Sequence, residues 1–444
     1  MPITQSEASP DDRRLDEERN WWTPGRRHYV LGILCVIGIF NFIDRQILAI
    51  LLEPIKTDLG VSDTLMGLLS GLAFSTVYVL AGIPIARIVD TGSRRILLSS
   101  CLGIWSLATM LCGLSQSFLH LALARIGVAG GEAGGAPASQ SMLADLYPAR
   151  NRGTVIGILS AAQAIGIALG LFLGGWLNAL FDWRSAFLVV GAPGLLLALI
   201  TLFTVREPAR GMSEEISRRA NVEEPASMSQ ALRQALRNPA LRILLLVAMS
   251  CSFAGYSILG WGPTFYVRVH GLSTMQVGLF MGLGVAVGLF LGNLFAGQIA
   301  DRVAKGDLSK YMKVGGIGTI LSAPAGVVFV LAEDLTVSLL GLFVSKLLMT
   351  FWLPPTYAVA LGLSSPGNRG MMTALLGLAG SLVGTGLGPL FVGIMNDVFT
   401  PIYGADGIRY SLLIVLVGLA LSGALCLISI PFVRREQQRM AAAG

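Results

Sequence analysis

The sequence predicts an all-α polytopic membrane protein with twelve transmembrane helices, arranged as two halves of six. Of its 444 residues, 54% are hydrophobic and only 13% are charged, and the mean hydropathy is +0.70. These values lie well outside the range of soluble globular domains. Long apolar stretches recur along the chain, and one polar break divides them into two sets. The stretches are continuous rather than alternating, which excludes the short spans of a β-barrel.

The individual spans follow from the lengths of these stretches, because a helix that rises about 1.5 Å per residue needs roughly 20 residues to cross the bilayer core. The N-terminal half, 28–205, contains predicted spans at approximately 28–52, 64–88, 96–115, 118–142, 153–178 and 184–205. The C-terminal half, 241–433, contains predicted spans at approximately 241–264, 274–300, 311–332, 335–363, 371–396 and 409–433.

Polar segments complete the chain: an N-terminal segment at 1–27, a linker at 206–240 and a tail at 434–444. The later part of the linker has apolar residues at helical spacing and predicts an amphipathic helix on the membrane surface. A solvated tether is the alternative.

The distribution of positive charge predicts the orientation. Most of the 32 Lys and Arg residues fall on the side of the termini when loops are assigned to alternate sides. The opposite side holds only Lys56, Arg184, Arg268 and Arg409. By the positive-inside rule both termini are cytoplasmic, and we expect a bacterial inner membrane. The net charge of +6 is therefore a topology signal and not a nucleic-acid footprint.

The two halves repeat each other in sequence. The matching positions are Gly60 and Gly271, Ser62 and Ser273, Gly67 and Gly278, Asp90 and Asp301, Asn151 and Asn368, Gly166 and Gly384, Gly170 and Gly388, and Asn178 and Asn396. Two parallel six-helix halves of this kind resemble the major facilitator fold, in which the substrate path runs between the halves.

Four ionisable residues stand inside predicted spans of the first half. Asp44 and Arg45 occur in Asn41-Phe-Ile-Asp-Arg in span one, and Arg125 and Glu132 lie seven residues apart on one face of span four. Intramembrane charges mark functional sites by default. We expect Arg45 to pair with Glu132, or Asp44 with Arg125, and the sequence does not choose. When a conformational change forms or breaks the ion pair between a buried carboxyl and a guanidinium, the pKa of the carboxyl changes, so the pair can couple proton binding to conformation. A static ion pair that fixes helix packing is the alternative.

The second half lacks equivalent acids. The repeat aligns Asp44 and Arg45 with Gly255 and Tyr256, and Glu132 with Thr350. We therefore expect the second half to supply a largely apolar wall to the substrate cavity. Its candidate residues are Lys346, Tyr256, Trp261, Phe265 and Trp352. Lys346 either meets an anionic headgroup or sits in a polar packing niche, and the aromatic residues face either the cavity or the lipid.

A short motif between spans two and three predicts a cytoplasmic gate. Asp90, Arg94 and Arg95 resemble the major facilitator loop signature, and the second half retains Asp301 and Arg302 of a second copy. Ala86, Thr91 and Ser93 depart from that signature. The resemblance implies control of conformation through acid–arginine and helix-end contacts, and topology anchoring is the alternative for the arginines.

Further motifs extend the resemblance to the spinster branch of the major facilitators. They include Asn41-Phe-Ile-Asp-Arg, Gly131-Glu-Ala, Ala144-Asp-Leu-Tyr-Pro, Asp182-Trp-Arg-Ser-Ala-Phe and Val205-Arg-Glu-Pro. The resemblance implies a proton-coupled carrier of an amphipathic lipid, such as a lysophospholipid or a sphingosine-phosphate-like molecule. The chain also resembles the anion:cation symporters for sugar acids at the same positions.

The resemblance and the composition together define the expected chemistry. We expect a secondary transporter that works by alternating access as a monomer and uses a proton gradient, without a cofactor or metal. Its partners are membrane lipids, protons and a small amphipathic or anionic substrate, and no nucleic acid. The sequence offers no nucleophile with a base and no metal-ligand cluster, so we expect no enzyme activity. A receptor or scaffold that does not transport is the alternative of another class.

Overall fold

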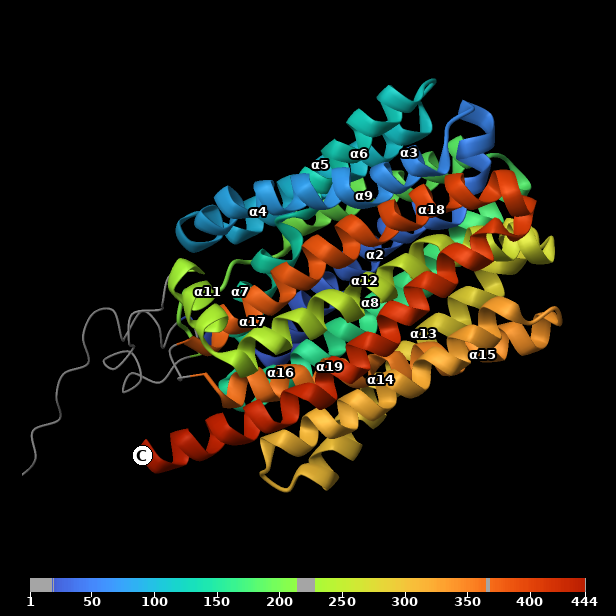
Figure 1. The fold of residues 1–444 in the computed structure, drawn as a ribbon. Coiled ribbons are helices and arrows are strands. Elements are labelled where there is room, and N and C mark those ends of the chain that lie inside the picture. Colours follow the sequence, from blue (N-terminus) through green and yellow to red (C-terminus); the bar gives the residue numbers. More distant parts are fainter. Residues whose placement is uncertain (1–17, 19, 214–227, 365–367, 444) are drawn as a thin grey trace, which may run out of the picture.

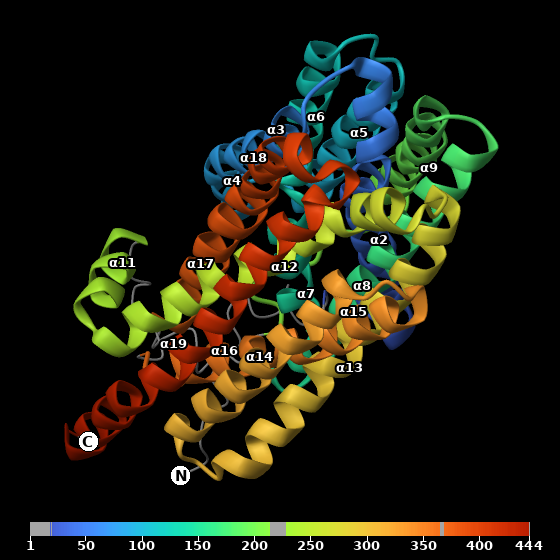
Figure 2. The same ribbon diagram turned by 45° about the vertical axis from the view of Figure 1, so that its right-hand side comes forward.

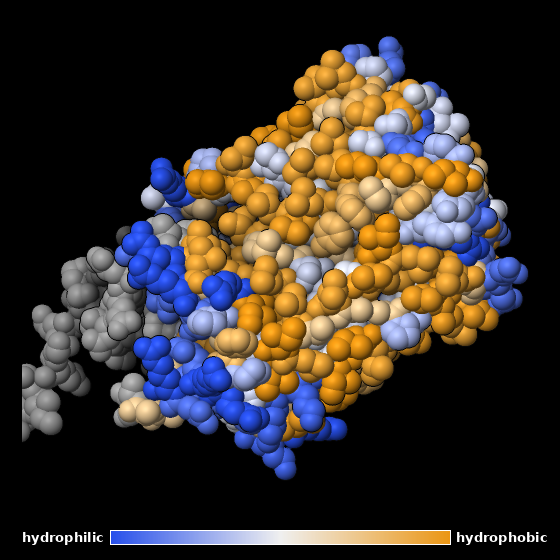
Figure 3. All heavy atoms as spheres, in the orientation of Figure 1, coloured by the Kyte–Doolittle hydropathy of each residue, from blue (hydrophilic) through white to orange (hydrophobic). Residues whose placement is uncertain are grey.

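The fold is a bundle of membrane-spanning helices. We use a computed structural model, which describes residues 18, 20–213, 228–364 and 368–443; most of the predicted N-terminal segment and the linker residues 214–227 lie outside these ranges. The described residues contain helices and no strand. An apolar belt separates two hydrophilic ends on the face shown in Figure 3. This pattern matches a protein surrounded by lipid.

The first half contains α2 to α9, and all the described helices of this half follow the predicted order. Their bounds are α2 (Pro24–Leu59), α3 (Asp63–Leu68), the π-helix η1 (Leu69–Ala73), α4 (Phe74–Thr91), α5 (Arg94–Gly113), α6 (Phe118–Glu132), α7 (Gly135–Leu146), α8 (Ala149–Leu180) and α9 (Trp183–Thr204).

The linker and the second half follow. Their bounds are α11 (Met228–Arg237), α12 (Pro239–His270), α13 (Thr274–Ala304), α14 (Leu308–Leu331), α15 (Leu335–Met349), the 3₁₀-helix η2 (Thr350–Trp352), α16 (Leu353–Gly362), α17 (Arg369–Gly380), the π-helix η4 (Ser381–Leu387), α18 (Gly388–Tyr403), the 3₁₀-helix η5 (Gly404–Asp406) and α19 (Gly407–Ala443).

Ten continuous helical stretches of the described residues are long and apolar enough to cross a membrane. One of them, residues 369–442, holds two passes, because the chain turns at Gly404 and α19 packs back along α18. The pair α6 and α7 makes a further pass that is broken after Glu132. The broken and joined helices therefore account for the twelve predicted spans.

The sequence repeat has a structural basis in the loops that follow α2 and α12. Gly60 and Gly271 both adopt left-handed backbone conformations, with φ of 63° and 64°, and each ends its helix. Two residues later, Ser62 and Ser273 each cap the next helix through their hydroxyl groups. Glycine tolerates the left-handed conformation and serine caps a helix well, which explains why both halves keep the same pair.

The bundle has two ends, which we call the terminal end and the far end. The terminal end carries α11 and the C-terminus of α19, as Figure 1 shows, and α11 lies beside the bundle in Figure 2. The far end carries the turns that follow α2 and α12. In the described residues, every hydrogen bond between the α2–α9 set and the α12–α19 set lies toward the far end. The hydrogen bonds of the described residues therefore join the halves toward the far end.

Close backbone packing joins the halves toward the same end. A Cβ atom on Gly67 would lie 2.5 Å from the carbonyl oxygen of Pro389, and one on Gly278 would lie 2.4 Å from that of Leu171. The π-helices η1 and η4 also meet there, with a Cβ on Gly71 2.5 Å from the carbonyl oxygen of Gly386. Any larger residue would push these helices apart.

Candidate functional site

A buried ion pair joins span one to span four. Arg45 on α2 donates from Nε to Oε2 of Glu132 on α6 at 2.7 Å. The Glu132 side chain is fully buried, whereas 18% of the Arg45 side chain is exposed. Of the two pairings that the sequence left open, the structure contains this one. The Arg45 side chain therefore contacts the buried Glu132 carboxylate on one side and accessible space on the other.

The other two charges of the site lie directly behind this pair. Arg125 donates from Nη1 to the main-chain oxygen of Asp44 at 3.3 Å, rather than to its carboxyl group. Asp44 is also buried, and Oδ1 of Asp44 and Oε1 of Glu132 have no hydrogen-bond partner in the described part of the chain. Asn41 stands one helical turn before Arg45 on α2, near Glu132. All five residues predicted for the coupling site therefore come together, with spare acceptor capacity on both carboxyl groups.

Glycines position Glu132 where it can reach Arg45. Helix α6 ends at Glu132, and the chain turns through Ala133 and Gly134 before α7. A Cβ on Gly131 would lie 2.8 Å from Cβ of Trp105, and one on Gly134 would lie 2.5 Å from Sγ of Cys101. These close approaches press the break in span four against α5, and they fix the carboxyl at the end of α6.

Two aromatic side chains of span two, Phe74 and Tyr78, lie against the arginines of the site. The sequence did not predict this contact. The guanidinium of Arg45 lies 5.0 Å from the ring centroid of Tyr78 and 5.2 Å from that of Phe74. Arg125 lies 5.3 Å from Phe74. Cation–π contacts of this kind stabilise a desolvated guanidinium. Phe74 and Tyr78 are four residues apart in span two, so they share one face of that helix. This spacing is the sequence signal that could have indicated the contact with Arg45 of span one.

A central cavity of about 350 Å³ lies beside this site. Its polar lining includes Lys346, Asn293, Tyr256, Thr350 and Tyr357, and its apolar lining includes Leu259, Val285, Leu289, Met349, Trp352 and Leu376. A smaller hollow reaches Arg45 and Arg125. Phe42, Tyr256 and Leu259 line both spaces, so the ion pair adjoins the cavity.

Two of the five predicted cavity residues lie elsewhere. Trp261 donates from its indole nitrogen to the main-chain oxygen of Pro389 at 2.8 Å, and Phe265 packs against Tyr266 and Phe329. Neither lines the cavity. Lys346, Tyr256 and Trp352 do line it, and Asn293 joins them although the sequence analysis did not select it.

Comparison with known proteins identifies the family of this helical bundle. The family model described as Major Facilitator Superfamily matches residues 34–389. The chain belongs to the Major Facilitator Superfamily. This membership, with its transporter relatives, makes it an integral membrane transporter and not an enzyme.

Relatives within the superfamily refine the similarity. An MFS-type efflux pump of Mycolicibacterium smegmatis is 33% identical over 404 residues, which is 91% of this chain and 92% of that protein. A probable galactarate/D-glucarate transporter of Bacillus subtilis is 27% identical over 63% of this chain and 66% of that protein.

A solved structure gives the same branch that the motifs indicate. The crystal structure of a bacterial homolog to the human lysosomal transporter Spinster, in an inward-facing and unoccupied conformation, matches with a TM-score of 0.84. The identity is 29%, and the match covers 93% of this chain and 99% of that one. This facilitator is therefore spinster-like.

The predicted gate residues organise one half of this facilitator and do not bridge the two halves. Buried Arg94 donates to Ser141 and to the main-chain oxygen of Pro208, and it pairs with Asp145 and Glu207. All these partners belong to the first half or the start of the linker.

The other four predicted gate residues make fewer hydrogen bonds than Arg94 among the described residues. Asp301 accepts from the Tyr311 hydroxyl at 2.7 Å, and Asp90 and Arg302 are exposed. The buried Nε of Arg95 has no hydrogen-bond partner within the described ranges. Among the described residues, none of the five predicted gate residues contacts the other half through a hydrogen bond. Their role in a closed gate stays a prediction.

Burial and hydrogen bonding act in opposite directions on Glu207, which lies outside the membrane spans. Burial raises the pKa of the Glu207 carboxyl, but hydrogen bonds from Ser93 and Arg94 outweigh it and hold that pKa below its usual range. The start of the linker is therefore fastened to α5 by an ionised carboxylate.

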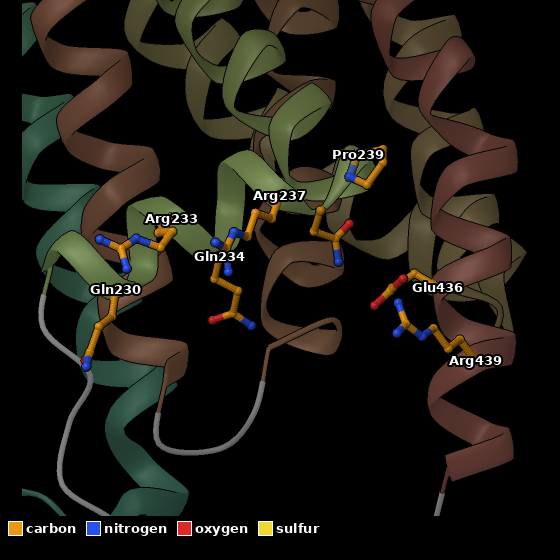
Figure 4. A pocket seen from close by; sticks show the side chains of 8 residues that line it. Gln230, Arg233, Gln234, Arg237, Pro239, Glu436 and Arg439 are labelled. Carbon is orange, nitrogen blue, oxygen red and sulfur yellow. The ribbon is translucent and has the colours of Figure 1, made fainter.

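A second hollow, of about 430 Å³, lies at the terminal end between α11 and the last turns of α19 (Figure 4). It is lined by Gln230, Arg233, Gln234, Arg237, Asn238, Pro239, Glu436 and Arg439. Its arginines are exposed, while Ala231 and Ala235 bury the inner face of α11. The linker residues 228–237 thus form a helix with its arginines toward the solvent, and its position on the membrane surface stays a prediction.

Proposed function

We propose that this facilitator is a proton-coupled secondary transporter that moves an amphipathic substrate by alternating access. The observation that carries the proposal is the buried Arg45–Glu132 pair, which stands beside a mostly apolar cavity between the halves. Among the residues that the structure describes, only the first half contributes acids to this region.

The coupling mechanism follows from the geometry of the pair. Protonation of Glu132 removes the charge that holds Arg45, and Arg45 then becomes free to turn toward the cavity through its exposed edge. Arginine keeps its own proton, so the carboxyl is the group that changes charge. Asp44, whose Oδ1 has no partner in the described chain, is a second candidate proton site. Each protonation state favours a different arrangement of the halves.

The arrangement of the halves corresponds to one state of this cycle. The halves are joined toward the far end, and we propose that both termini are cytoplasmic, so this state opens inward. The similarity to an inward-facing spinster homolog supports this assignment. Residues from both halves of a single chain line the cavity, so we propose that the monomer is functional. We also propose that it resides in a bacterial inner membrane.

The lining of the cavity supports an amphipathic lipid such as a lysophospholipid or a sphingosine-phosphate-like molecule. A sugar acid needs many hydrogen-bonding groups to replace water on its hydroxyls, whereas the apolar side chains of Leu259, Val285, Leu289, Met349 and Leu376 line much of this cavity. The similarity to a galactarate/D-glucarate transporter keeps a sugar-acid proton symporter as the second candidate.

Flux measurements with purified protein in liposomes test the proposal. We expect an imposed pH gradient to drive accumulation of an oleoyl lysolipid, but not of glucarate, against empty liposomes as the control. Accumulation of glucarate alone would establish the second candidate. The absence of any pH-driven flux would refute proton coupling, and would favour a receptor or scaffold.

A further inference from the structure

Lys346 is a buried cation without an acidic partner in the described chain. It lies near the end of α15, is 2% exposed, and donates from Nζ to the main-chain oxygen of Gly255 at 3.2 Å. An ammonium group has three donors and a large desolvation penalty, so one carbonyl oxygen leaves it poorly compensated.

Within the described part of the chain, the surrounding helices place no carboxylate in contact with the Lys346 ammonium group. The nearest acids in sequence, Glu333 and Asp334, precede α15, which places them about 18 Å away along the helix. Asp397 instead accepts from the backbone of α3 at the far end. Buried charges are normally paired, and this one faces a cavity.

Close packing fixes the position of the lysine. A Cβ on Gly288 would lie 3.4 Å from Cβ of Lys346, and one on Gly292 would lie 2.2 Å from the main-chain oxygen of Leu347. Helix α13 therefore lies directly against α15 and fixes the base of the lysine side chain at the wall of the cavity.

The two arginines near the cavity lie with the acidic residues of the first half, and neither of them lines the cavity itself. Arg45 binds Glu132, and Arg125 binds the main-chain oxygen of Asp44. Beside Lys346 the cavity also presents Oδ1 of Asn293, which is buried without a hydrogen-bond partner in the described residues. An ammonium group and a free acceptor together fit an anionic group with a hydroxyl nearby. The apolar side chains of Leu259, Val285 and Leu289 fit a hydrocarbon chain.

We propose that Lys346 is the substrate's anion-binding residue and that the cargo is a lipid-like anion with its charged group on α15 and its chain along α12 and α13. This inference rests on the proposed function, because it names the charge of the amphipathic substrate and its orientation. It separates the two roles in space: the first half binds protons, and the second half binds the anion.

The test compares three ligands that share a chain or a charge. Binding of oleoyl lysophosphatidic acid, monooleoylglycerol and glucarate is measured with detergent-purified wild type, Lys346→Met, Lys346→Arg and Lys310→Met. Monooleoylglycerol carries the same chain without the phosphate. Lys310→Met makes the same chemical change at an exposed lysine outside the cavity.

We expect Lys346→Met to weaken binding of lysophosphatidic acid about 10- to 100-fold, since one charge-assisted contact is lost. Monooleoylglycerol should be unaffected by this change, Lys346→Arg should restore most of the loss, and Lys310→Met should resemble wild type. Equal binding of lysophosphatidic acid by wild type and Lys346→Met would overturn the proposal, as would equal affinity of wild type for the charged and neutral lipids. If none of the three ligands binds wild type, the proposal also fails.

Two outcomes separate this inference from the proposed function. If glucarate binds and Lys346→Met weakens it, the anion site stands and the lipid class is wrong. If wild type drives lipid flux with a pH gradient and Lys346→Met does the same with unchanged affinity, the proposed function stands and the anion site is wrong.

Discussion

Replacing Arg268 with Gln should open the far end of the transporter. Arg268 belongs to the far-end ion network, which we define as Glu53, Lys56, Asp63 and Arg268. Its guanidinium on α12 lies 2.6 Å from Glu53 and 2.5 Å from Asp63, both in the other half. The Asp63 side chain is fully buried, and Lys56 contacts it at 2.7 Å. This network is the strongest electrostatic contact between the halves in the described residues.

The size of the effect follows from these burial values. Removing one partner of a buried ion pair costs about 3–5 kcal/mol. The Glu53 side chain is 24% exposed and Lys56 still compensates Asp63, so solvent screening reduces our value to about 2–3 kcal/mol. Since each 1.4 kcal/mol is a factor of ten, the equilibrium should shift about 30- to 150-fold away from the observed state.

Distances between spin labels measure this shift. Leu114 and Ile402 are exposed at the far end, one in each half, and they accept labels after the five native cysteines are replaced. We expect Arg268→Gln to add a population with a longer distance. Arg184→Gln is the matched control, because Arg184 pairs at the same end with Asp58 of its own half. The reasoning is refuted if Arg268→Gln gives the wild-type distribution, or if Arg184→Gln opens the far end equally.

Two further changes test packing and the linker. Gly71→Ala should weaken the η1–η4 contact by about 1–3 kcal/mol, because its Cβ would lie 2.5 Å from the Gly386 carbonyl oxygen. Gly82→Ala, where nothing lies within 4 Å, should have little effect on the same thermal unfolding assay, and equal melting temperatures for both variants would contradict the packing argument. The pKa of Glu207 is lowered on folding, so its contribution to stability is present above the usual glutamate pKa of about 4.3 and is lost as pH falls below that value. Wild type should therefore lose more thermal stability than Glu207→Gln between about pH 5 and 3, and parallel losses would count against the Arg94 contact.

The sequence predicted which charged residues of the first half come together, because a charge inside an apolar span is a local signal that is easy to recognise. Asp44, Arg45 and Glu132 stand out wherever a charge appears in an apolar span, and helical periodicity places Arg125 on the same face as Glu132. The repeat also matched Gly60 with Gly271, and the structure gives both the same left-handed helix cap, because such a cap depends on a few neighbouring residues only.

The sequence failed where contacts join distant helices. Arg268 counted only as an isolated positive charge near a span end, although it meets Asp63 from 205 positions away. Trp261 and Phe265 were predicted to line the cavity, but periodicity alone does not tell which face of a buried helix meets the cavity and which packs inside its own half. Asn293 received no role for the same reason.

The most direct test of the central claim is the behaviour of Glu132→Gln in liposomes, with pH-driven accumulation and substrate exchange at equal pH measured on the same preparation. Our account predicts that this variant exchanges substrate but loses at least about tenfold of its pH-driven accumulation, because the neutral amide no longer binds and releases a proton. Full pH-driven accumulation by Glu132→Gln, matching wild type, would contradict the claim that the Arg45–Glu132 pair couples proton movement to transport.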